Sequence, residues 1–333
     1  MTDAPNKGVH PLVTVIIRSK ARATLPDALA SVARQTHPNL EVVIIDATGG
    51  RHPRVADRCG PFPVRLIPAD APLNRPQAAN RGLDHASGEW LIFLDDDDFF
   101  DPSHVASLLA TAQRSGRRVA YSGTRVLDAQ GRVVWQLNHP YARLALFEHN
   151  YIQMGAALFY RSLVELGCRF DENMLLYQDW DFWLQLAKHG DFAHSNVVTN
   201  NWRAYSGQSG AGTGPNADVA LQTRFTRRLR EKWGGARDRL VVFLGKAGRH
   251  AQWLLSHRRA QDAVRLLSVA ITLAPEDPGL LNLLGIAFFQ AGQLGEAWKV
   301  LMKVQQLLPD NESVRRNLEL VERKRFGTSA EID

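Results

Sequence analysis

The stretch WLIFLDDDDFF, residues 90–100, decides the fold of the chain. Its first five residues form an uninterrupted apolar run, which is typical of a strand buried in a sheet. Four consecutive carboxylates follow, and a folded chain tolerates their mutual repulsion mainly when a cation or hydrogen bonds compensate it. A solvated acidic turn is the alternative, but two phenylalanines close the cluster on its other side. The stretch therefore predicts a buried strand that ends in a cluster of carboxylates with a role in function.

Similar apolar runs precede this stretch and alternate with helical segments. One helix is indicated at residues 74–85, where Asn74 is a suitable N-cap and Pro76 falls in the first turn. The alternation predicts an α/β fold, a mostly parallel sheet with helices on both faces. Ligands bind beyond the carboxyl ends of the strands in such sheets, where Asp46 and Asp95 lie. The predicted strands are residues 12–17, 41–46, 64–67 and 90–94, and the predicted helices are residues 24–35, 74–85 and 103–114.

The chain changes character after about Gly234, where strand signals end and leucine, alanine, arginine and glutamine dominate. Three pairs of like residues recur there at a separation of about 34 positions, the tetratricopeptide period. We expect an α/β domain over residues 1–234 and a tetratricopeptide-like helical domain over residues 235–333. Two repeats are too few for an independent solenoid, so they would lean on each other or on the first domain; a plain helical bundle is the alternative. The pairs are Ala263 and Ala297, Leu267 and Leu301, and Pro275 and Pro309.

The composition is that of an ordinary globular protein, since 45% of the 333 residues are hydrophobic and 22% are charged. This length suggests two domains, and the balance is too apolar for disorder. The two cysteines, Cys59 and Cys168, form no CxxC pair, which favours a reduced, intracellular setting. The first residues lack the apolar core of a signal peptide, and the sequence has no run of about 18 apolar residues that would span a membrane. These features predict a cytoplasmic protein.

Positive charge is concentrated in one part of the chain, although the net charge is only +6. Residues 222–265 hold 12 lysines and arginines against 3 acidic residues, which leaves 28 basic and 31 acidic residues elsewhere. Such a stretch can contact an anionic membrane surface, an acidic partner or nucleic acid, or it can be a solvated helical face. Phe225, Leu229 and Trp233 share one helical face there and would either touch a membrane or pack on the repeats. We expect a peripheral contact at the inner face of the membrane and no nucleic-acid partner.

The acidic cluster has the chemistry of a metal site. Hard divalent cations such as Mg²⁺ take oxygen ligands, commonly one or two carboxylates together with substrate phosphates. The alternating Asp95 and Asp97 suit a cation that offsets the charge of a departing diphosphate. A calcium loop of the EF-hand type is excluded because no glycine or glutamate falls at the required offsets. A phosphate-ester hydrolase that uses an Asp-x-Asp pair remains an alternative, although the usual small-Thr turn does not follow the cluster.

Several short motifs follow one another in the first two thirds of the chain. They are residues 13–18, residues 28–36 with Pro38, residues 80–82, Ala86 with residues 88–89, residues 93–98 with Pro102, Arg161, residues 166–167, residues 170–172, and residues 178–181. In order and spacing they resemble the family 2 glycosyltransferases, which have the A-type glycosyltransferase fold. The resemblance covers roughly residues 11–206.

The resemblance implies an activity. The chain would be an inverting, metal-dependent glycosyltransferase that moves a sugar from a nucleotide-diphosphate sugar to an acceptor hydroxyl. Its setting would be glycan or cell-surface polysaccharide biosynthesis, with a glycan, a lipid-linked glycan or a protein as acceptor. The helical repeats would then dock a protein partner, orient the acceptor or mediate self-association.

The resemblance also implies roles for single residues. Asp46 would lie in the nucleotide pocket, and Asp95 would contact the nucleoside, with Asp96 beside it. Asp97, together with Asp95, would hold Mn²⁺ or Mg²⁺ on the diphosphate. Asp179 would be the general base that deprotonates the acceptor hydroxyl. Capping of the helix that follows is the alternative role for Asp179.

Three arginines would complete the phosphate site. Arg81 lies in a motif next to Asn80, and Arg18 and Arg75 offer further bidentate donors, with surface solvation as the alternative for each. His194 would be a second metal ligand or a structural histidine.

Two positions depart from the family pattern. Ala47 stands where a second aspartate usually follows Asp46, and Gln178 stands where a glutamate usually precedes the catalytic aspartate. The two losses favour a degenerate domain that serves the repeats as a scaffold, whereas the aspartate cluster and Asp179 favour an active enzyme. The glycine-rich residues 206–214 would be a loop that closes over substrate, or a linker.

Overall fold

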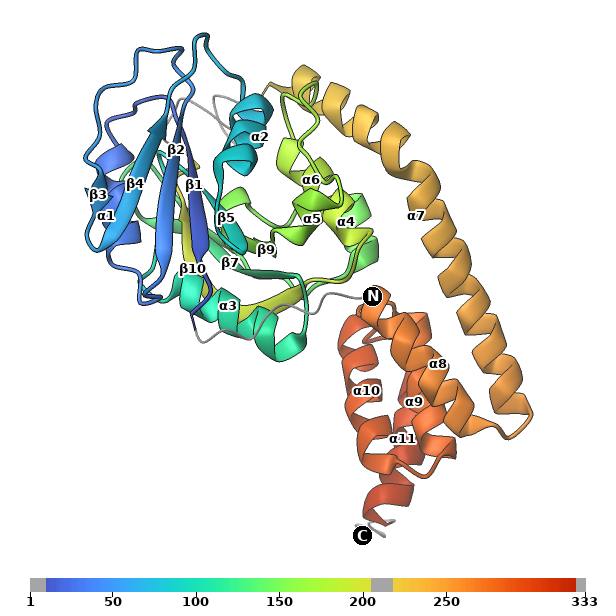
Figure 1. Ribbon diagram of the computed structural model, residues 1–333. Helices are drawn as coiled ribbons and strands as arrows, with labels where there is room; N and C mark the ends of the chain where they lie inside the picture. Colours follow the sequence, from blue (N-terminus) through green and yellow to red (C-terminus); the bar gives the residue numbers. More distant parts are fainter. Residues whose placement is uncertain (1–9, 205–217, 328–333) are drawn as a thin grey trace. The chain divides into compact units, whose positions relative to one another are not determined.

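The structure is a computed structural model that describes residues 10–204 and 218–327 (Figure 1). It separates into two compact units. The first comprises the chain up to Tyr141 together with His149–Lys232, and the second comprises Ala142–Glu148 together with the chain from Trp233. The border falls inside one long helix, near the border expected at residue 234, and a short internal segment is grouped with the second unit.

The described part of the first unit contains one ten-stranded sheet. Its strands are β1 (Val13–Ser19), β2 (Leu40–Asp46), β3 (Arg58–Cys59), β4 (Phe62–Ile67), β5 (Trp90–Asp95), β6 (Phe99–Phe100), β7 (Val119–Leu127), β8 (Val133–Leu137), β9 (Ala157–Tyr160) and β10 (Ala193–Trp202). The order is β3-β4-β2-β1-β5-β9-β7-β10-β6, with β8 paired to β7. The neighbours β4, β2, β1 and β5 are parallel, whereas β9 runs antiparallel to both β5 and β7.

The register of the parallel strands brings four polar residues to one edge of the sheet. Arg18 pairs with Asp95 across β1 and β5, and Ser19 pairs with Asp46 across β1 and β2. The strand interiors are buried on both faces, as their continuous apolar sequences predict. The functional side chains therefore gather where the strands end, at the edge expected from the sequence.

Helices cover both faces of this sheet, which confirms the predicted fold class (Figure 1). One face packs on α1 (Leu25–Ala33) and α3 (His104–Ser115), which share a core cluster with Val15 and Ile17 of β1. The other face packs on α2 (Arg75–His85), where Gly82 lies against Ile16, and on α6 (Gln178–Ala187). The shorter helices are η1 (Met154–Ala156), α4 (Arg143–Glu148) and α5 (Ser162–Glu165).

The predicted start of α2 is confirmed in detail. Asn74 is the N-cap, and its side chain accepts a bond from the Gln77 amide at 2.9 Å. The Gln77 side chain in turn accepts from the Asn74 amide at 3.0 Å, which completes a capping box. The cap places Arg75, the next residue, at the edge of the sheet where the strands end.

A close approach between strands makes Gly88 a sensitive position. A Cβ atom there would lie 2.6 Å from the backbone nitrogen of Thr14 and 2.9 Å from the carbonyl oxygen of Leu12. We expect Gly88→Ala to lower the free energy of unfolding by about 1–3 kcal/mol, because rigid backbone must move to admit the methyl group. Urea denaturation measures the effect. The matched control is Gly295→Ala, where nothing lies within 4 Å of the added atom, and equal midpoints for the two variants would contradict the expectation.

The second unit is all-helical. It contains the second half of α7 (Val219–Ser256), followed by α8 (Ala260–Leu273), α9 (Pro278–Gln290), α10 (Leu294–Leu307) and α11 (Glu312–Phe326). Antiparallel neighbours pack along the chain, and Gly285 of α9 lets Leu301 of α10 approach its backbone closely. No helix in the described residues is long and apolar enough to cross a membrane.

Candidate active site

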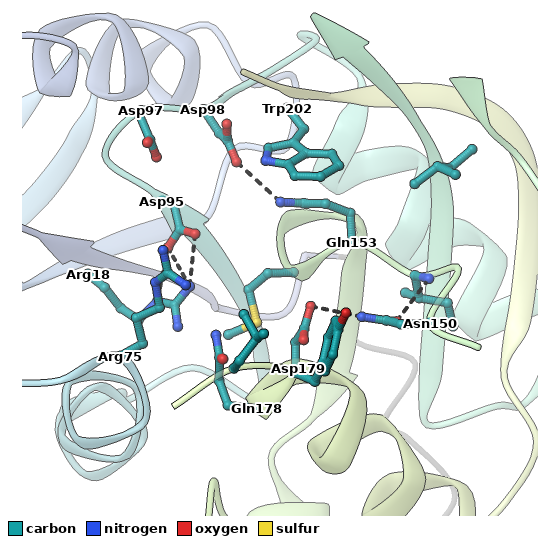
Figure 2. A pocket seen from close by; sticks show the side chains of 15 residues that line it. Arg18, Arg75, Asp95, Asp97, Asp98, Asn150, Gln153, Gln178, Asp179 and Trp202 are labelled. Carbon is teal, nitrogen blue, oxygen red and sulfur yellow. Dashed lines mark hydrogen bonds and ion pairs between the residues drawn. The ribbon is translucent and has the colours of Figure 1, made fainter. Parts of the chain in front are cut away.

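A cavity of about 200 Å³ opens at the edge of the sheet where β1 and β5 end (Figure 2). One side is formed by β1, the start of α2 and the acidic residues after β5. The opposite side is formed by η1 with the segment before it, the start of α6 and the end of β10. The lining residues, all in the first unit, are Arg18, Arg75, Asp95, Asp97, Asp98, Leu137, Asn150, Ile152, Gln153, Met154, Leu176, Tyr177, Gln178, Asp179 and Trp202.

Asp95 is held by Arg18 on the neighbouring strand. The guanidinium donates two bonds to Asp95 Oδ1, 2.9 Å from Nε and 2.6 Å from Nη2, and one to Oδ2 at 2.8 Å. The third nitrogen, Arg18 Nη1, is buried and has no hydrogen-bond partner among the described residues. A buried donor without a partner is costly, so Arg18 both orients Asp95 and offers one donor to a bound ligand.

Asp96 points away from the cavity. Its carboxylate is fully buried, accepts bonds from Ser19 Oγ at 3.0 Å and the Lys20 amide at 2.7 Å, and forms an ion pair with Arg22. These contacts anchor the loop after β1. The structure thus does not bring Asp96 into the cavity where the nucleotide was expected to meet it.

Asp95, Asp97 and Asp98 form the acidic cluster of the cavity. One carboxylate oxygen of each lies within 4.8 Å of those of the other two. The amide of Asp98 donates to the carbonyl of Asp95 at 3.1 Å, so the chain turns directly after β5 and brings these side chains to one side.

Mutual repulsion contributes to raised pKa values for two carboxyl groups of the cluster. Burial and the neighbouring Asp95 raise the pKa of Asp97, although Arg22 opposes the rise. Burial, Asp97 and Asp95 raise the pKa of Asp98 well above its ordinary value. A divalent cation would relieve this repulsion, and a set of carboxylate oxygens matches the ligands that Mg²⁺ and Mn²⁺ prefer.

Two residues that the sequence analysis did not assign hold Asp98 in place. The side-chain amide of Gln153 donates to Asp98 Oδ2 at 3.2 Å, and the backbone amide of Arg203 donates to Oδ1 at 2.9 Å. The guanidinium of Arg203 also donates to the Asp97 carbonyl at 3.3 Å. Arg203 thus anchors the acidic cluster, and the glycine-rich residues 206–214, expected to form a closing loop or a linker, lie outside the described part of the chain.

Asp179 faces the same cavity from the first turn of α6 (Figure 2). Asn150 donates to its Oδ2 at 3.1 Å and the Trp180 amide donates to its Oδ1 at 2.8 Å. Burial raises the pKa of Asp179, although these two bonds and Arg18 oppose the rise. A carboxylate with a raised pKa in a cavity is a stronger proton acceptor than an ordinary one.

The N-cap position of α6 is Tyr177, so Asp179 is not the N-cap residue, although its side chain accepts from an amide of the first turn. Tyr177 has a left-handed backbone conformation with φ of 59°. Such conformations are costly for residues other than glycine and occur often at active sites. Gln178, the next residue, is buried, and its Oε1 has no partner among the described residues. The start of α6 thus presents a carboxylate and an unpaired acceptor at the cavity.

The other aspartate of the QDWD motif is structural. Asp181 is fully buried and pairs with Lys232 of α7 at 2.9 Å. Phe225 and Leu229, in the same half of α7, are also buried, and so is Trp233. Of the two alternatives for these three side chains, burial by packing is therefore the one observed, because none of them is accessible to a membrane.

Asp46 does not line the cavity. Its carboxylate accepts bonds from the amide and hydroxyl of Thr48, both at 2.6 Å, and from the Gly50 amide at 2.9 Å. Burial alone would raise the pKa of Asp46, but these bonds hold it below its ordinary value. Asp46 shapes the loop after β2, and Ala47 lines a small adjoining pocket that shares Arg18, Arg75 and Asp95 with the cavity.

The remaining predicted residues separate into two groups. Arg75 lines the cavity, where burial lowers the pKa of its guanidinium and the nearby Asp95 opposes that effect. Arg81 does not line the cavity, and its guanidinium donates instead to the carbonyl of Pro68 at 2.6 Å. His194 bonds to Asn138 at 2.8 Å and is not part of the acidic cluster, so a second metal ligand is not found there.

Comparison with known proteins identifies the class. Residues 13–170 match the model of glycosyl transferase family 2. The uncharacterized glycosyltransferase YwdF of Bacillus subtilis is 27% identical over 239 residues, which cover 66% of this chain and 83% of YwdF. The amylovoran biosynthesis glycosyltransferase AmsB of Erwinia amylovora is 24% identical over 220 residues, 59% of this chain and 72% of AmsB. The protein is a glycosyltransferase.

The residues that match the family model lie mostly in the first unit. Among solved structures, S. aureus TarS 1-349 in complex with UDP-GlcNAc superimposes with a TM-score of 0.50 at 16% sequence identity. The match covers 97% of this chain and 94% of that chain. At this identity the match bears on the fold, and it extends beyond the family 2 domain into the helical unit.

Proposed function

We propose that the protein transfers a sugar from a nucleotide-diphosphate sugar to an acceptor hydroxyl, with a divalent cation and with inversion of the anomeric configuration. One observation carries the proposal: a cluster of three carboxylates and a separate carboxylate with a raised pKa, Asp179, line the same cavity. The first suits a diphosphate with its cation, and the second suits proton transfer.

The donor would bind on the β5 side of the cavity. Asp97 and Asp95 would hold Mn²⁺ or Mg²⁺, with Asp98 beside them in the same cluster. When bound, the cation would neutralise charge that develops on the departing diphosphate. The two guanidinium groups of Arg18 and Arg75 add positive charge there, and the unpaired Nη1 of Arg18 offers a donor to a phosphate oxygen.

Asp179 would act as the general base on the opposite side. The acceptor hydroxyl would give its proton to the Asp179 carboxylate while its oxygen forms a bond to the anomeric carbon. The bond from that carbon to the phosphate oxygen would break on the other side, and the nucleoside diphosphate would leave with the bonding electrons. Inversion is supported because the other carboxylates that line the cavity belong to one cluster, where Arg18 bonds to Asp95 and Gln153 bonds to Asp98, and where Asp97 would hold the cation.

Asn150 would be a positioning residue for this base. Its side-chain amide donates to Asp179 Oδ2, and its own Oδ1 accepts from the Ile152 amide at 3.3 Å, which fixes the carboxamide. Three residues further on, Gln153 bonds to Asp98. The four-residue segment 150–153 would therefore hold the base and the acidic cluster at a set separation.

We expect Asn150→Ala to reduce kcat by roughly tenfold to a hundredfold, because the base loses its orientation. The lost bond stabilises the ionised carboxylate, so the pKa of Asp179 rises further and the acid limb of the pH–rate profile moves to higher pH. The profile of initial rates measures this shift. Asn317→Ala, which removes an amide bond to Asn282 in the helical unit, is the control; an unmoved acid limb in Asn150→Ala would reduce Asn150 to a packing role.

A donor panel tests the proposed function. Purified protein is incubated with UDP-, GDP- and dTDP-sugars with Mn²⁺, with Mg²⁺ or with a chelator, and release of nucleoside diphosphate is measured. UDP-sugars come first, because UDP and UDP-GlcNAc are bound in the TarS structures. We expect release that requires the cation, and a product whose anomeric proton coupling in NMR indicates inversion. Retention, or equal release with the chelator, would refute the corresponding part of the proposal.

The same panel separates the two alternatives. A phosphate-ester hydrolase would release orthophosphate from simple esters, and a degenerate scaffold would release nothing from any donor. The match to polysaccharide enzymes supports a glycan or lipid-linked glycan as acceptor, with a protein as the other candidate.

We propose that the chain divides into a catalytic domain at residues 1–234 and a helical domain at residues 235–333. The helical domain would consist of two tetratricopeptide-like repeats that bind a protein partner. The repeat is supported by equivalent caps: Asp277 accepts from the third residue of α9, and Asn311 accepts from the third residue of α11. A structural period that matches the sequence period favours repeats over an irregular bundle.

A further inference from the structure

The second half of α7 carries an exposed face that is both basic and aromatic. We call it the α7 face, and its members lie at spacings of three and four residues, so they form one stripe along the helix. From the first member to the last it extends about 27 Å along the helix axis. The α7 face consists of Arg239, Val242, Phe243, Lys246, Arg249, His250 and Trp253 of α7, together with His257 directly after the helix, all exposed.

The fold of the helical unit does not use the α7 face. The opposite side of the same helix supplies Leu244, Ala247, Ala251 and Leu254 to the core formed with α8 and α9. Three large apolar side chains nevertheless remain outside, with Val242 53%, Phe243 43% and Trp253 47% exposed. Exposed apolar side chains grouped on one surface, rather than scattered singly, indicate an interaction site.

The charges of the α7 face are also uncompensated within the chain. Arg239, Lys246 and Arg249 make no ion pair with a carboxylate in the described residues, whereas the nearby Arg237 pairs with Asp238 and Glu148. No acidic residue belongs to the α7 face. The surface is therefore complementary to an anionic partner.

The tryptophan of the face is held in place by stacking. Trp253 lies between two histidines, with ring centroids 5.7 Å from His250 and 4.2 Å from His257. The three rings are nearly parallel, with interplanar angles of 10° and 28°. Stacking limits the rotamers of the indole and keeps it exposed, so its insertion into a partner would lose little conformational entropy.

We propose that the α7 face binds the surface of a bilayer that contains anionic lipids. One side of a helix can lie on a flat surface, and all members of the face share one side of α7. Tryptophan and phenylalanine bury in the interface between headgroups and acyl chains, while lysine and arginine attract anionic headgroups. Nucleic acid fits less well, because three permanent cations over about 27 Å are sparse against a charge every 1.7 Å or so of duplex.

Vesicle co-sedimentation of the full-length protein tests the inference. The vesicles contain phosphatidylcholine alone or phosphatidylcholine with phosphatidylglycerol. We expect binding to the mixed vesicles that weakens as salt rises, and little binding to phosphatidylcholine alone. Phe243→Ser with Trp253→Ala, and separately Lys246→Glu with Arg249→Glu, should each weaken binding by more than about tenfold.

Matched controls lie on other helices of the same unit. Val269→Ser with Leu320→Ser removes exposed apolar side chains elsewhere, and Arg315→Glu with Arg316→Glu makes the same charge change on α11. Both should bind the mixed vesicles like the unaltered protein, and far-UV circular dichroism checks that every variant is folded.

Two results would overturn the inference: no binding of the unaltered protein to mixed vesicles, or equal losses in the control variants. Sensitivity to the charge reversals without sensitivity to the Phe243 and Trp253 changes would also overturn it, since it would indicate a general polyanion site. The assay needs no donor or acceptor, so its outcome is independent of the proposed glycosyl transfer.

Discussion

Asp179→Asn is expected to reduce the rate of sugar transfer by about a thousandfold while leaving nucleotide binding almost unchanged. The asparagine has the shape of the aspartate but cannot accept the proton of the acceptor hydroxyl. Burial raises the pKa of Asp179, so the ionised carboxylate carries a desolvation cost that the neutral amide does not. We therefore expect the midpoint of thermal unfolding to stay at its original value. Initial rates, nucleotide titration and thermal unfolding measure the three quantities.

The control for this variant lies two residues away on the same helix. Asp181→Asn weakens a buried ion pair with Lys232 and should lower the unfolding free energy by about 1–3 kcal/mol. It should retain transfer activity at temperatures where it is folded, because Asp181 does not line the cavity. If Asp179→Asn lost nucleotide binding, or unfolded earlier than Asp181→Asn, the role of Asp179 would be structural.

The pH dependence of the unaltered enzyme follows from the same residue. A base must be ionised to act, and the raised pKa of Asp179 means that protonation begins at a higher pH than for an ordinary aspartate. The rate should consequently fall on the acid side while most surface carboxylates are still ionised.

Asp97→Ala should reduce transfer by about a hundredfold to a thousandfold and abolish its response to Mn²⁺. Asp97 shares the cluster with Asp95 and Asp98, and its loss would remove one of the proposed oxygen ligands together with part of the mutual repulsion. A binding readout accompanies the rate: Mn²⁺ with UDP should raise the unfolding midpoint of the unaltered protein and have little effect on the variant.

Asp70→Ala is the control for Asp97→Ala, since Asp70 is an exposed aspartate of the first unit that does not line the cavity. It should keep both the rate and the Mn²⁺ response. Equal Mn²⁺ responses in Asp97→Ala and the unaltered protein would remove the metal site from the proposal. Whether the protein cleaves a nucleotide-sugar donor at all is tested separately, by the donor panel described above.

Much of the first unit follows from the sequence alone, because strands and helices are set by interactions between near neighbours. The apolar runs predicted β1, β2, β4 and β5 within one or two residues at each end. The Asn74 cap and the proline in the first turn predicted the start of α2 correctly. The order of these elements predicted the fold class, since parallel strands with helical crossovers have few alternative arrangements.

The roles of neighbouring aspartates were harder to predict. The sequence predicts one ligand site for Asp95, Asp96 and Asp97, whereas in the structure Asp96 turns inward to Arg22 and Asp98 lines the cavity. The turn after β5 ends the regular alternation of side chains between the two faces, so position in the sequence no longer decides direction. Arg81 was misplaced for a similar reason, since α2 directs it toward Pro68.

The sequence by itself determined the strands β1, β2, β4 and β5, the four carboxylates at the end of β5, and the helical character of the last third of the chain. Only the tertiary structure decided which of those carboxylates share a cavity with Asp179, and that Asn150 and Gln153 hold the two sides of that cavity. Asn150 and Gln153 are two polar side chains in the short segment NYIQ, which hints at a functional role, but the neighbouring sequence does not indicate which residues they contact. Contacts of this kind join residues 29 and 55 positions apart. They depend on how strands and helices pack, and no short-range pattern encodes that packing.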